Sequence, residues 1–130
     1  MDNPIKIAID AMGGDNSPEK VIKGIEIHNI DSKNTYYNIF GNQEVILPLI
    51  KKTKLSSANY KIIHTDNLIK DTDSPLSAAK KGKNTSMWLS IESLKRMESD
   101  ATVSAGNTGA LFVIAKLNLK MIEKIDKPAL

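Results

Sequence analysis

The clearest hydrophobic pattern lies near the start of the chain, where apolar residues alternate and then run together over Ile5–Ile9. β-branched residues in such a pattern are typical of a buried strand. Gly13-Gly14 follows, a pair that can adopt backbone conformations closed to other residues or lie directly against a ligand. Ser17-Pro18 then indicates a helix start, with the serine hydroxyl as N-cap and the proline at the first helical position. Strand, glycine turn and helix start in this order are used by α/β proteins to bind anions.

The remaining pattern predicts further strands and helices in alternation. We expect strands at Thr35–Phe40, Tyr60–His64 and Ala101–Ala105, and helices at Pro18–Ile30, Gln43–Lys52, Pro75–Lys81, Thr85–Glu98 and Asn107–Lys124. Pro48 predicts a kink or a break in the second of these helices. The last helix is expected to be the longest, and Ala129-Leu130 indicates the start of one more strand.

Alternating strands and helices predict a three-layer α/β/α fold, with parallel strands, right-handed crossovers and helices on both faces of the sheet. Such sheets bind ligands at the carboxyl ends of their strands. The glycine loops after Ile9 and after Ser104 should therefore open at the same edge.

Composition narrows the function classes. The 130 residues suffice for one domain, with 41% apolar and 25% charged residues, as in a soluble globular protein. The net charge is only +3, and Arg96 is the single arginine, which argues against a nucleic-acid surface. There is no cysteine, so thiolate chemistry is excluded. No signal-peptide pattern opens the sequence and the apolar runs are too short to span a bilayer, so we expect a cytoplasmic protein.

The loop Ala105–Gly109 is the second candidate for anion binding. Asn107 can cap the following helix, and the amides of Thr108 and Gly109 would point from its positive end toward a phosphate or an oxyanion. Taken alone, however, the loop fits better a tight strand-to-helix turn with Asn107 as an ordinary N-cap.

Asp10 and Asp15 flank the first glycine turn. Asp10 is at least as well explained as a strand-end carboxylate that accepts hydrogen bonds from the amides of its own turn. Asp15 would repel a phosphate, so it more plausibly positions the loop. Two carboxylates without a nearby histidine are a poor metal signal, and we expect neither a metal nor a cofactor.

Lys80, Lys81 and Lys83 form the single short basic cluster of the sequence. A solvated helix end is the plainer interpretation. In the functional interpretation, the ammonium groups hold phosphate or attract an acidic carrier protein. Ser86 could donate a hydrogen bond to phosphate or could cap its helix.

Three stretches, in order, resemble one family. Asp10–Asp15 with Asn16 and Pro18, then Lys83–Met87, then Val103–Leu111 are similar to the motifs of the acyl-carrier-protein:phosphate acyltransferases, the PlsX family. Members are more than twice as long, so the chain resembles their N-terminal portion. Most members carry arginines before the second motif, where this chain has lysines, and Thr85 replaces a serine. Any inherited arginine role is therefore in doubt.

The resemblance implies a fold like that of isopropylmalate dehydrogenases and phosphotransacetylases. It also implies transfer of a fatty acyl group from acyl-carrier protein to inorganic phosphate, in phospholipid synthesis. With it we favour a ligand site that combines both glycine loops. Its residues would be Asn107, Asp10 and Asp15 as the catalytic set, with Gly13, Gly14, Lys83, Ser86, Thr108 and Gly109 binding phosphate.

Further expectations concern the full-length protein and the chain as given. The full-length protein is expected to form a homodimer and to contact the membrane peripherally through downstream regions. A related phosphate acetyl- or butyryltransferase that uses coenzyme A thioesters remains an alternative, as does an inactive truncated fragment. A chain ending at Leu130 would leave a sheet edge unpaired, so we expect little activity and self-association from these residues alone.

Overall fold

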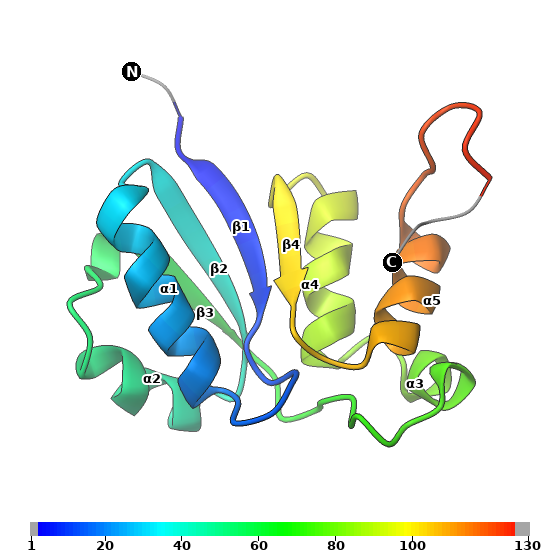
Figure 1. Ribbon diagram of the computed structural model, residues 1–130, viewed down its shortest axis with the longest axis horizontal. Helices are drawn as coiled ribbons and strands as arrows, with labels where there is room; N and C mark the ends of the chain where they lie inside the picture. The colour runs from blue at the N-terminus through cyan, green and yellow to red at the C-terminus, as the bar shows by residue number, and fades with distance from the viewer. Residues whose placement is uncertain (1–2, 127–130) are drawn as a thin grey trace.

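The computed structural model describes residues 3–126 and shows a parallel sheet with helices on both faces (Figure 1). Its elements in chain order are β1 (Ile5–Asp10), α1 (Glu19–Asp31), β2 (Thr35–Gly41), α2 (Gln43–Lys51), a short 3₁₀ helix (Ser57–Asn59), β3 (Tyr60–His64), α3 (Pro75–Lys81), α4 (Ser86–Lys95), β4 (Ala101–Ser104) and α5 (Thr108–Asn118). The strands are ordered β3-β2-β1-β4, and every pairing is parallel. The predicted α/β architecture is confirmed.

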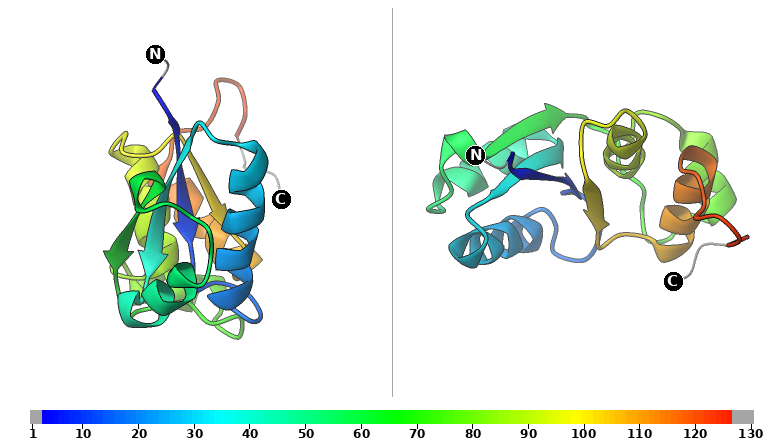
Figure 2. Two further views of the ribbon diagram at one scale, coloured as in Figure 1. Left: turned by 90° about the vertical axis from the view of Figure 1, so that its left-hand side faces the viewer. Right: turned by 90° about the horizontal axis from the view of Figure 1, so that it is seen from above.

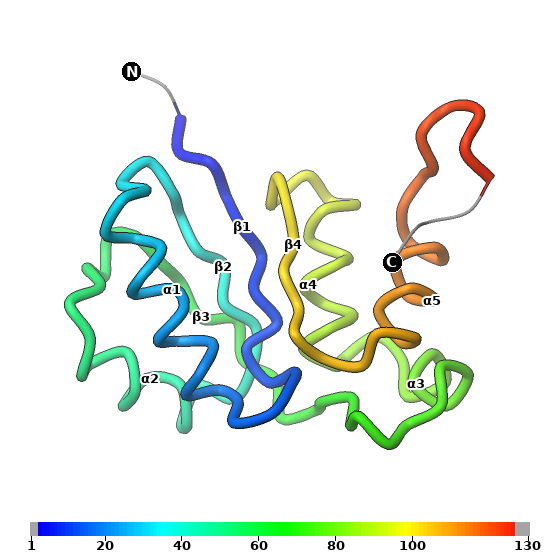
Figure 3. The backbone as a smooth tube through the Cα atoms, viewed as in Figure 1, coloured from blue at the N-terminus to red at the C-terminus, as the bar shows by residue number. Residues whose placement is uncertain are grey.

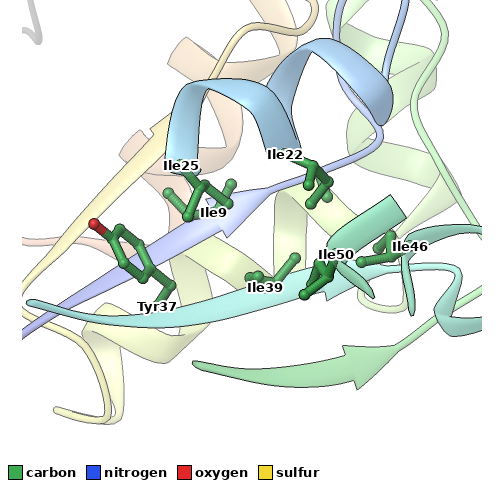
Figure 4. Close-up of a cluster of buried hydrophobic side chains, with 8 residues drawn as sticks. Ile9, Ile22, Ile25, Tyr37, Ile39, Ile46 and Ile50 are labelled. Atoms are coloured by element: carbon green, nitrogen blue, oxygen red, sulfur yellow. The ribbon is translucent and has the colours of Figure 1, made fainter. Parts of the chain in front are cut away.

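Helices α1 and α2 cover one face of the sheet. Ile9 lies between Ile39 and Val103 in the strand register, and its side chain faces α1. Figure 4 shows the buried cluster between this helix and the strands. The cluster consists of Ile9, Ala11, Ile22, Ile25, Tyr37, Ile39, Ile46 and Ile50. Most of its members are β-branched or aromatic residues, which fill a pleated surface well.

Helix α4 covers the opposite face, where it contacts β1, β2 and β4. Helices α3 and α5 pack against each other, and α5 also packs against α4, so this half extends beyond the β4 edge (Figure 2). The second buried cluster lies among these helices and consists of Ile69, Ala78, Met87, Trp88, Ile91, Ala110 and Ile114. The second core is therefore formed by helices and the loop residue Ile69, and α4 connects it to the sheet.

The prediction for the last helix was wrong in length. Helix α5 ends at Asn118 after 11 residues, and α1 is longer with 13. The apolar stripe does continue to Ile122, but that side chain is 79% exposed. A helix is stabilised mainly by packing of its apolar face, and beyond Leu119, which packs against the second core, the exposed Ile122 gains little from such packing. The strand expected at Ala129-Leu130 lies outside the described residues.

Two proline predictions also need correction. Helix α1 begins at Glu19 with Pro18 as its N-cap residue, and the Ser17 hydroxyl instead donates to the Gly13 carbonyl oxygen at 2.5 Å. Ser17 thus closes the glycine turn rather than capping the helix. The break that was one alternative at Pro48 does not occur, because α2 is one continuous helix of nine residues. Burial of Ile46 and Ile50 on either side of Pro48 offsets its missing hydrogen bond.

Candidate functional site at the carboxyl edge of the sheet

Several segments meet where β1 and β4 end. Both strands point to the same edge, and the amino ends of α4 and α5 lie there too (Figure 1). Figure 3 traces the backbone from β1 and from β4 into this region. The predicted meeting of the two glycine loops is confirmed, because a Cβ atom built on Gly13 would lie 2.9 Å from the Gly106 Cα.

The Asp10 carboxylate connects these segments. It is buried, with 1% of the residue exposed, and its Oδ1 accepts from the Ser86 hydroxyl at 2.7 Å. Its Oδ2 accepts from the Ser104 hydroxyl at 2.7 Å. The Met12 and Gly13 amides also donate to Oδ1, at 3.3 and 3.2 Å. The turn interpretation of Asp10 is therefore confirmed, and the same carboxylate also fixes α4 and the end of β4.

The serines beside Asp10 have specific positions. Thr85, not Ser86, caps α4, since the Thr85 side chain accepts from the Trp88 amide. The capping alternative for Ser86 was therefore wrong. Ser104 extends this hydrogen-bond network to the second glycine loop, because its Oγ accepts from the Gly106 amide at 3.2 Å. Asp10 thus orders the first residues of both glycine loops.

The glycines allow close approach of protein segments. A Cβ on Gly14, whose φ is +92°, would lie 2.6 Å from the Ala105 carbonyl oxygen. A Cβ on Gly109 would lie 2.7 Å from the Pro75 Cγ at the start of α3. These glycines are needed for loop-to-loop and helix-to-helix packing, whether or not a ligand approaches them.

Asn107 is the N-cap of α5, as predicted. Its Oδ1 accepts from the Ala110 amide at 3.1 Å. Its Nδ2 donates to the Asp73 carbonyl oxygen at 2.6 Å and to that of Lys70 at 3.2 Å. The side chain thus joins α5 to the segment before α3. It uses its donors there, so the backbone amides of this helix end, rather than the Asn107 side chain, are placed to face an anion.

Unpaired amides and lysines make the edge suitable for an anion. Within the described residues, the amides of Thr108 and Gly109 donate no hydrogen bond, and neither do those of Gly14 and Asp15. The first two lie at the positive end of α5. Lys83 is exposed in the loop before α4, and no ion pair of its ammonium group occurs among residues 3–126. Lys81, by contrast, is paired with Asp73 at 2.6 Å.

A largely apolar groove of about 510 Å³ opens beside the first turn, between α1 and the strands β1 and β4. Ile7, Ile9 and Val103 form its floor, and Val21, Gly24 and Ile25 belong to the α1 wall. At its carboxyl end lie Asp15, Ser17 and Lys20. The groove is therefore polar at one end and apolar along the rest of its length.

Two further features concern metals and membranes. In the described part of the chain, no three histidine, aspartate or glutamate side chains gather as metal ligands would. Among the same residues, no helix has both the length and the hydrophobicity to cross a bilayer.

Sequence reasoning did not single out Ser104 or the Asp73 segment. Ser104 could have been found from the pattern, because it ends β4 directly opposite Asp10, which ends β1. Polar residues at the ends of adjacent parallel strands share one edge. The partners of Asn107 in the 70–73 segment carry no such signal, since backbone carbonyls are common to all residues.

Comparison with known proteins decides the family. Residues 5–130 match the family model described as fatty acid synthesis protein. The chain belongs to this family.

Members with curated names include the phosphate acyltransferases of Pelagibacter ubique, Azorhizobium caulinodans and Ehrlichia ruminantium. The chain is 61% identical to the first over 130 residues, 42% to the second over 131 and 39% to the third over 129. The matches cover 100%, 100% and 97% of this chain, but 38%, 37% and 38% of those relatives. The chain thus spans less than two fifths of the relatives' length, which confirms the expected partial match.

The hydrogen-bonded network around Asp10 is built from the stretches that resemble the family motifs. The three stretches that carry the resemblance contribute Asp10 and Gly13, Ser86, and Ser104 and Gly106 to one hydrogen-bonded network. Residues distant in the chain and similar to family motifs therefore meet at one place. This convergence makes the carboxyl edge the candidate functional site.

Proposed function

We propose that the protein transfers a fatty acyl group from acyl-carrier protein to inorganic phosphate, yielding an acyl phosphate for phospholipid synthesis. The observation that carries the proposal is the meeting of three family-like motifs around Asp10, beside unpaired amides and a lysine. The printed name of the relatives, phosphate acyltransferase, supports the reaction class. The choice of acyl-carrier protein and the pathway are our inference from the resemblance.

In this reaction, a phosphate oxygen attacks the thioester carbonyl carbon and forms a tetrahedral intermediate. The carbon–sulfur bond then breaks, the proton of hydrogen phosphate passes to the departing sulfur, and the acyl phosphate and the carrier thiol remain. Hydrogen phosphate is already an anionic nucleophile near neutral pH. The protein therefore has two tasks, which are to place it beside the thioester and to stabilise the oxyanion.

The candidate site suits these tasks. The Thr108 and Gly109 amides, at the positive end of α5, would hold phosphate or the oxyanion, and those of Gly14 and Asp15 would assist. Lys83 adds a cation at the edge of the site. Asp10, Ser86 and Ser104 act as positioning residues, because their polar groups bond to one another and to the loops.

A donor-and-acceptor assay tests the proposal. The full-length protein that contains these residues is incubated with palmitoyl acyl-carrier protein, with and without phosphate, and both thioester loss and acyl phosphate are measured. We expect thioester loss that depends on phosphate and matches the acyl phosphate formed. Loss at the same rate without phosphate would contradict the proposal.

The second candidate is a phosphate acyltransferase that accepts coenzyme A thioesters. The same assay with palmitoyl, butyryl and acetyl coenzyme A separates the two. A preference for a coenzyme A donor would replace acyl-carrier protein as the proposed donor and leave phosphate as the acceptor.

A further inference from the structure

Residues 68–81, which we call the strap, form an excursion between β3 and α4 that includes α3 (Figure 1). The residues on either side of the strap are fastened to each other. The Thr65 hydroxyl donates to the Asn84 carbonyl oxygen, and Asn67 forms an isolated parallel bridge with Thr85. The chain therefore leaves and returns at one place, so the strap can move without separating β3 from α4.

Few contacts join the strap to the rest of the described chain. Within residues 3–126, every hydrogen bond between the strap and another segment comes from the Asn107 side chain. Its Nδ2 donates to the Asp73 carbonyl oxygen at 2.6 Å and to that of Lys70 at 3.2 Å. Ile69 and Ala78 add buried apolar contacts in the second core. Segments with so few attachments open locally at low cost in free energy.

The other polar contacts of the strap lie within it. The Lys81 ammonium donates to Asp73 Oδ2 at 2.6 Å, and the Lys70 amide donates to the same oxygen at 2.8 Å. The Ser74 side chain caps α3 by accepting from the Ser77 amide. With seven residues, α3 is too short to be a stable helix without its surroundings. The strap is thus tied together internally, and its position depends on α5.

The strap contacts α5 on both sides of Thr108, whose amide donates no hydrogen bond within the described residues. On one side, Asn107 supplies the hydrogen bonds and also caps α5, because its Oδ1 accepts from the Ala110 amide at 3.1 Å. On the other side, a Cβ on Gly109 would lie 2.7 Å from the Pro75 Cγ. The first turn of α5 therefore both holds the strap and presents its amides to the candidate site.

We propose that the strap opens and closes as one unit, that Asn107 is the positioning residue that latches it to α5, and that phosphate at the candidate site favours the closed form. Phosphate bound by the Thr108 and Gly109 amides fixes the first turn of α5, and this turn holds the strap. Because coupling is reciprocal, a closed strap in turn raises the affinity for phosphate. The identity of the ligand rests on the proposed function, and the latch rests on the Asn107 contacts.

Hydrogen–deuterium exchange of the full-length protein that contains these residues tests the coupling. Exchange is followed by mass spectrometry with inorganic phosphate and with sodium chloride at the same ionic strength. We expect phosphate to slow the exchange of the strap amides about fivefold or more, which is within the usual range for coupled sites. Exchange in α2, on the other face of the sheet, should not respond.

The variant Asn107→Ser separates the latch from the cap. Serine caps a helix about as well as asparagine, but it lacks the Nδ2 group that reaches the strap. We expect the strap amides to exchange about fivefold faster, because one net hydrogen bond changes an equilibrium by about that factor. The KM for phosphate should rise by more than kcat falls, since the binding-competent closed form becomes less populated.

The matched control is Asn42→Ser. Asn42 also caps a helix, since its side chain accepts from the Glu44 amide at 3.0 Å, but its Nδ2 donates no hydrogen bond within residues 3–126. This variant should leave the exchange of the strap and the KM for phosphate unchanged. The melting temperature of each variant verifies folding.

Strap exchange that does not respond to phosphate in the unaltered protein would overturn the proposal, and this measurement needs no variant. Equal strap exchange in Asn107→Ser and Asn42→Ser would also overturn it. Exchange is measured without a thioester, so it is independent of the enzyme assay. If phosphate protects the strap but thioester loss ignores phosphate, the proposed function fails and the phosphate-responsive strap remains. If thioester loss requires phosphate but the strap does not respond to it, only the strap proposal fails.

Discussion

At the residue scale, Asp10 is the side chain that holds the segments of the candidate site together. A buried carboxylate is stable when hydrogen bonds replace its hydration. Here two hydroxyls and two amides supply those bonds, and each comes from a segment that the candidate site needs in place. The residue therefore acts as a connector between β1, α4 and β4 rather than as a group facing the substrate.

Replacement of Asp10 by alanine should be strongly destabilising. The change leaves the buried Ser86 hydroxyl, the half-buried Ser104 hydroxyl and two amides without their acceptor, and each unsatisfied buried group costs about 1–3 kcal/mol. We expect the free energy of unfolding to fall by at least about 2 kcal/mol. Urea titration followed by circular dichroism measures this change.

The control for Asp10→Ala is Asp66→Ala. The Asp66 side chain is 74% exposed, and its carboxylate lies 3.4 Å from the His64 Nε2. Substitution at such a site should change stability by no more than about 0.5 kcal/mol. Equal effects of the two substitutions would show that the network around Asp10 does not hold the loops.

At the scale of elements, α3 and α5 depend on a glycine contact. The Gly109 Cα approaches Pro75 so closely that a Cβ would lie 2.7 Å from the Pro75 Cγ. The two helices form part of the second core, and α5 also presents its amino end to the candidate site. Their spacing therefore affects both stability and the position of the Thr108 and Gly109 amides.

Gly109→Ala should separate these helices and lower stability by about 1–3 kcal/mol, as overpacking does. In the background Pro75→Ala, which removes the contacting Cγ, the same change should cost less. A double-mutant cycle from urea titrations measures the coupling. Additive effects of the two substitutions would mean that this contact is not the cause.

A salt bridge also holds the segment before α3 in place. The Lys81 ammonium donates to Asp73 Oδ2 at 2.6 Å, and with the Lys70 amide at 2.8 Å it lowers the pKa of the Asp73 carboxyl below its usual value. A lowered pKa in the folded state means that the stabilisation is present above the unfolded pKa, about 3.9. It is lost as pH falls through the folded pKa.

We therefore expect Lys81→Met to raise the pKa of Asp73 toward its unfolded value, and to do so more than Lys80→Met. Lys80 is the neighbouring, exposed lysine of the same helix, and within residues 3–126 it forms no ion pair. Carboxyl chemical shifts followed by NMR from neutral to acidic pH give both values. An unchanged pKa in Lys81→Met would contradict this account.

At the scale of the whole molecule, the sheet separates two apolar cores. One lies beneath α1 and α2, and the other among α3, α4 and α5. The strands β1 and β2 connect the two, because they contribute residues to the first core and contact α4, which belongs to the second. A sheet shared in this way should make the described residues unfold as one cooperative unit.

This cooperativity can be tested with one substitution in each core, Ile46→Val and Ile114→Val. Both side chains are 0% exposed, so each change should cost about 0.5–1.5 kcal/mol. The residues lie in different clusters, so the two costs should add within about 0.5 kcal/mol. Two separate unfolding transitions, in urea or on heating, would show instead that the cores are independent.

The sequence by itself determined the strands, the parallel sheet and the edge at which the glycine loops meet. Alternating apolar runs and turn residues are local signals, and the chirality of crossovers leaves few arrangements for them. Asn107 was also correctly predicted as a helix N-cap, because capping depends only on residues within one turn of the helix end.

Only the tertiary structure decided what those residues contact. Ser17 bonds to Gly13 rather than to its helix, and Ser86 and Ser104 meet on Asp10 from positions 76 and 94 residues away. Helix α5 stops at Asn118 although its apolar pattern continues. Hydrogen-bond partners and helix ends depend on which surfaces fold against one another, and spacing along the chain carries little information about contacts made across a sheet.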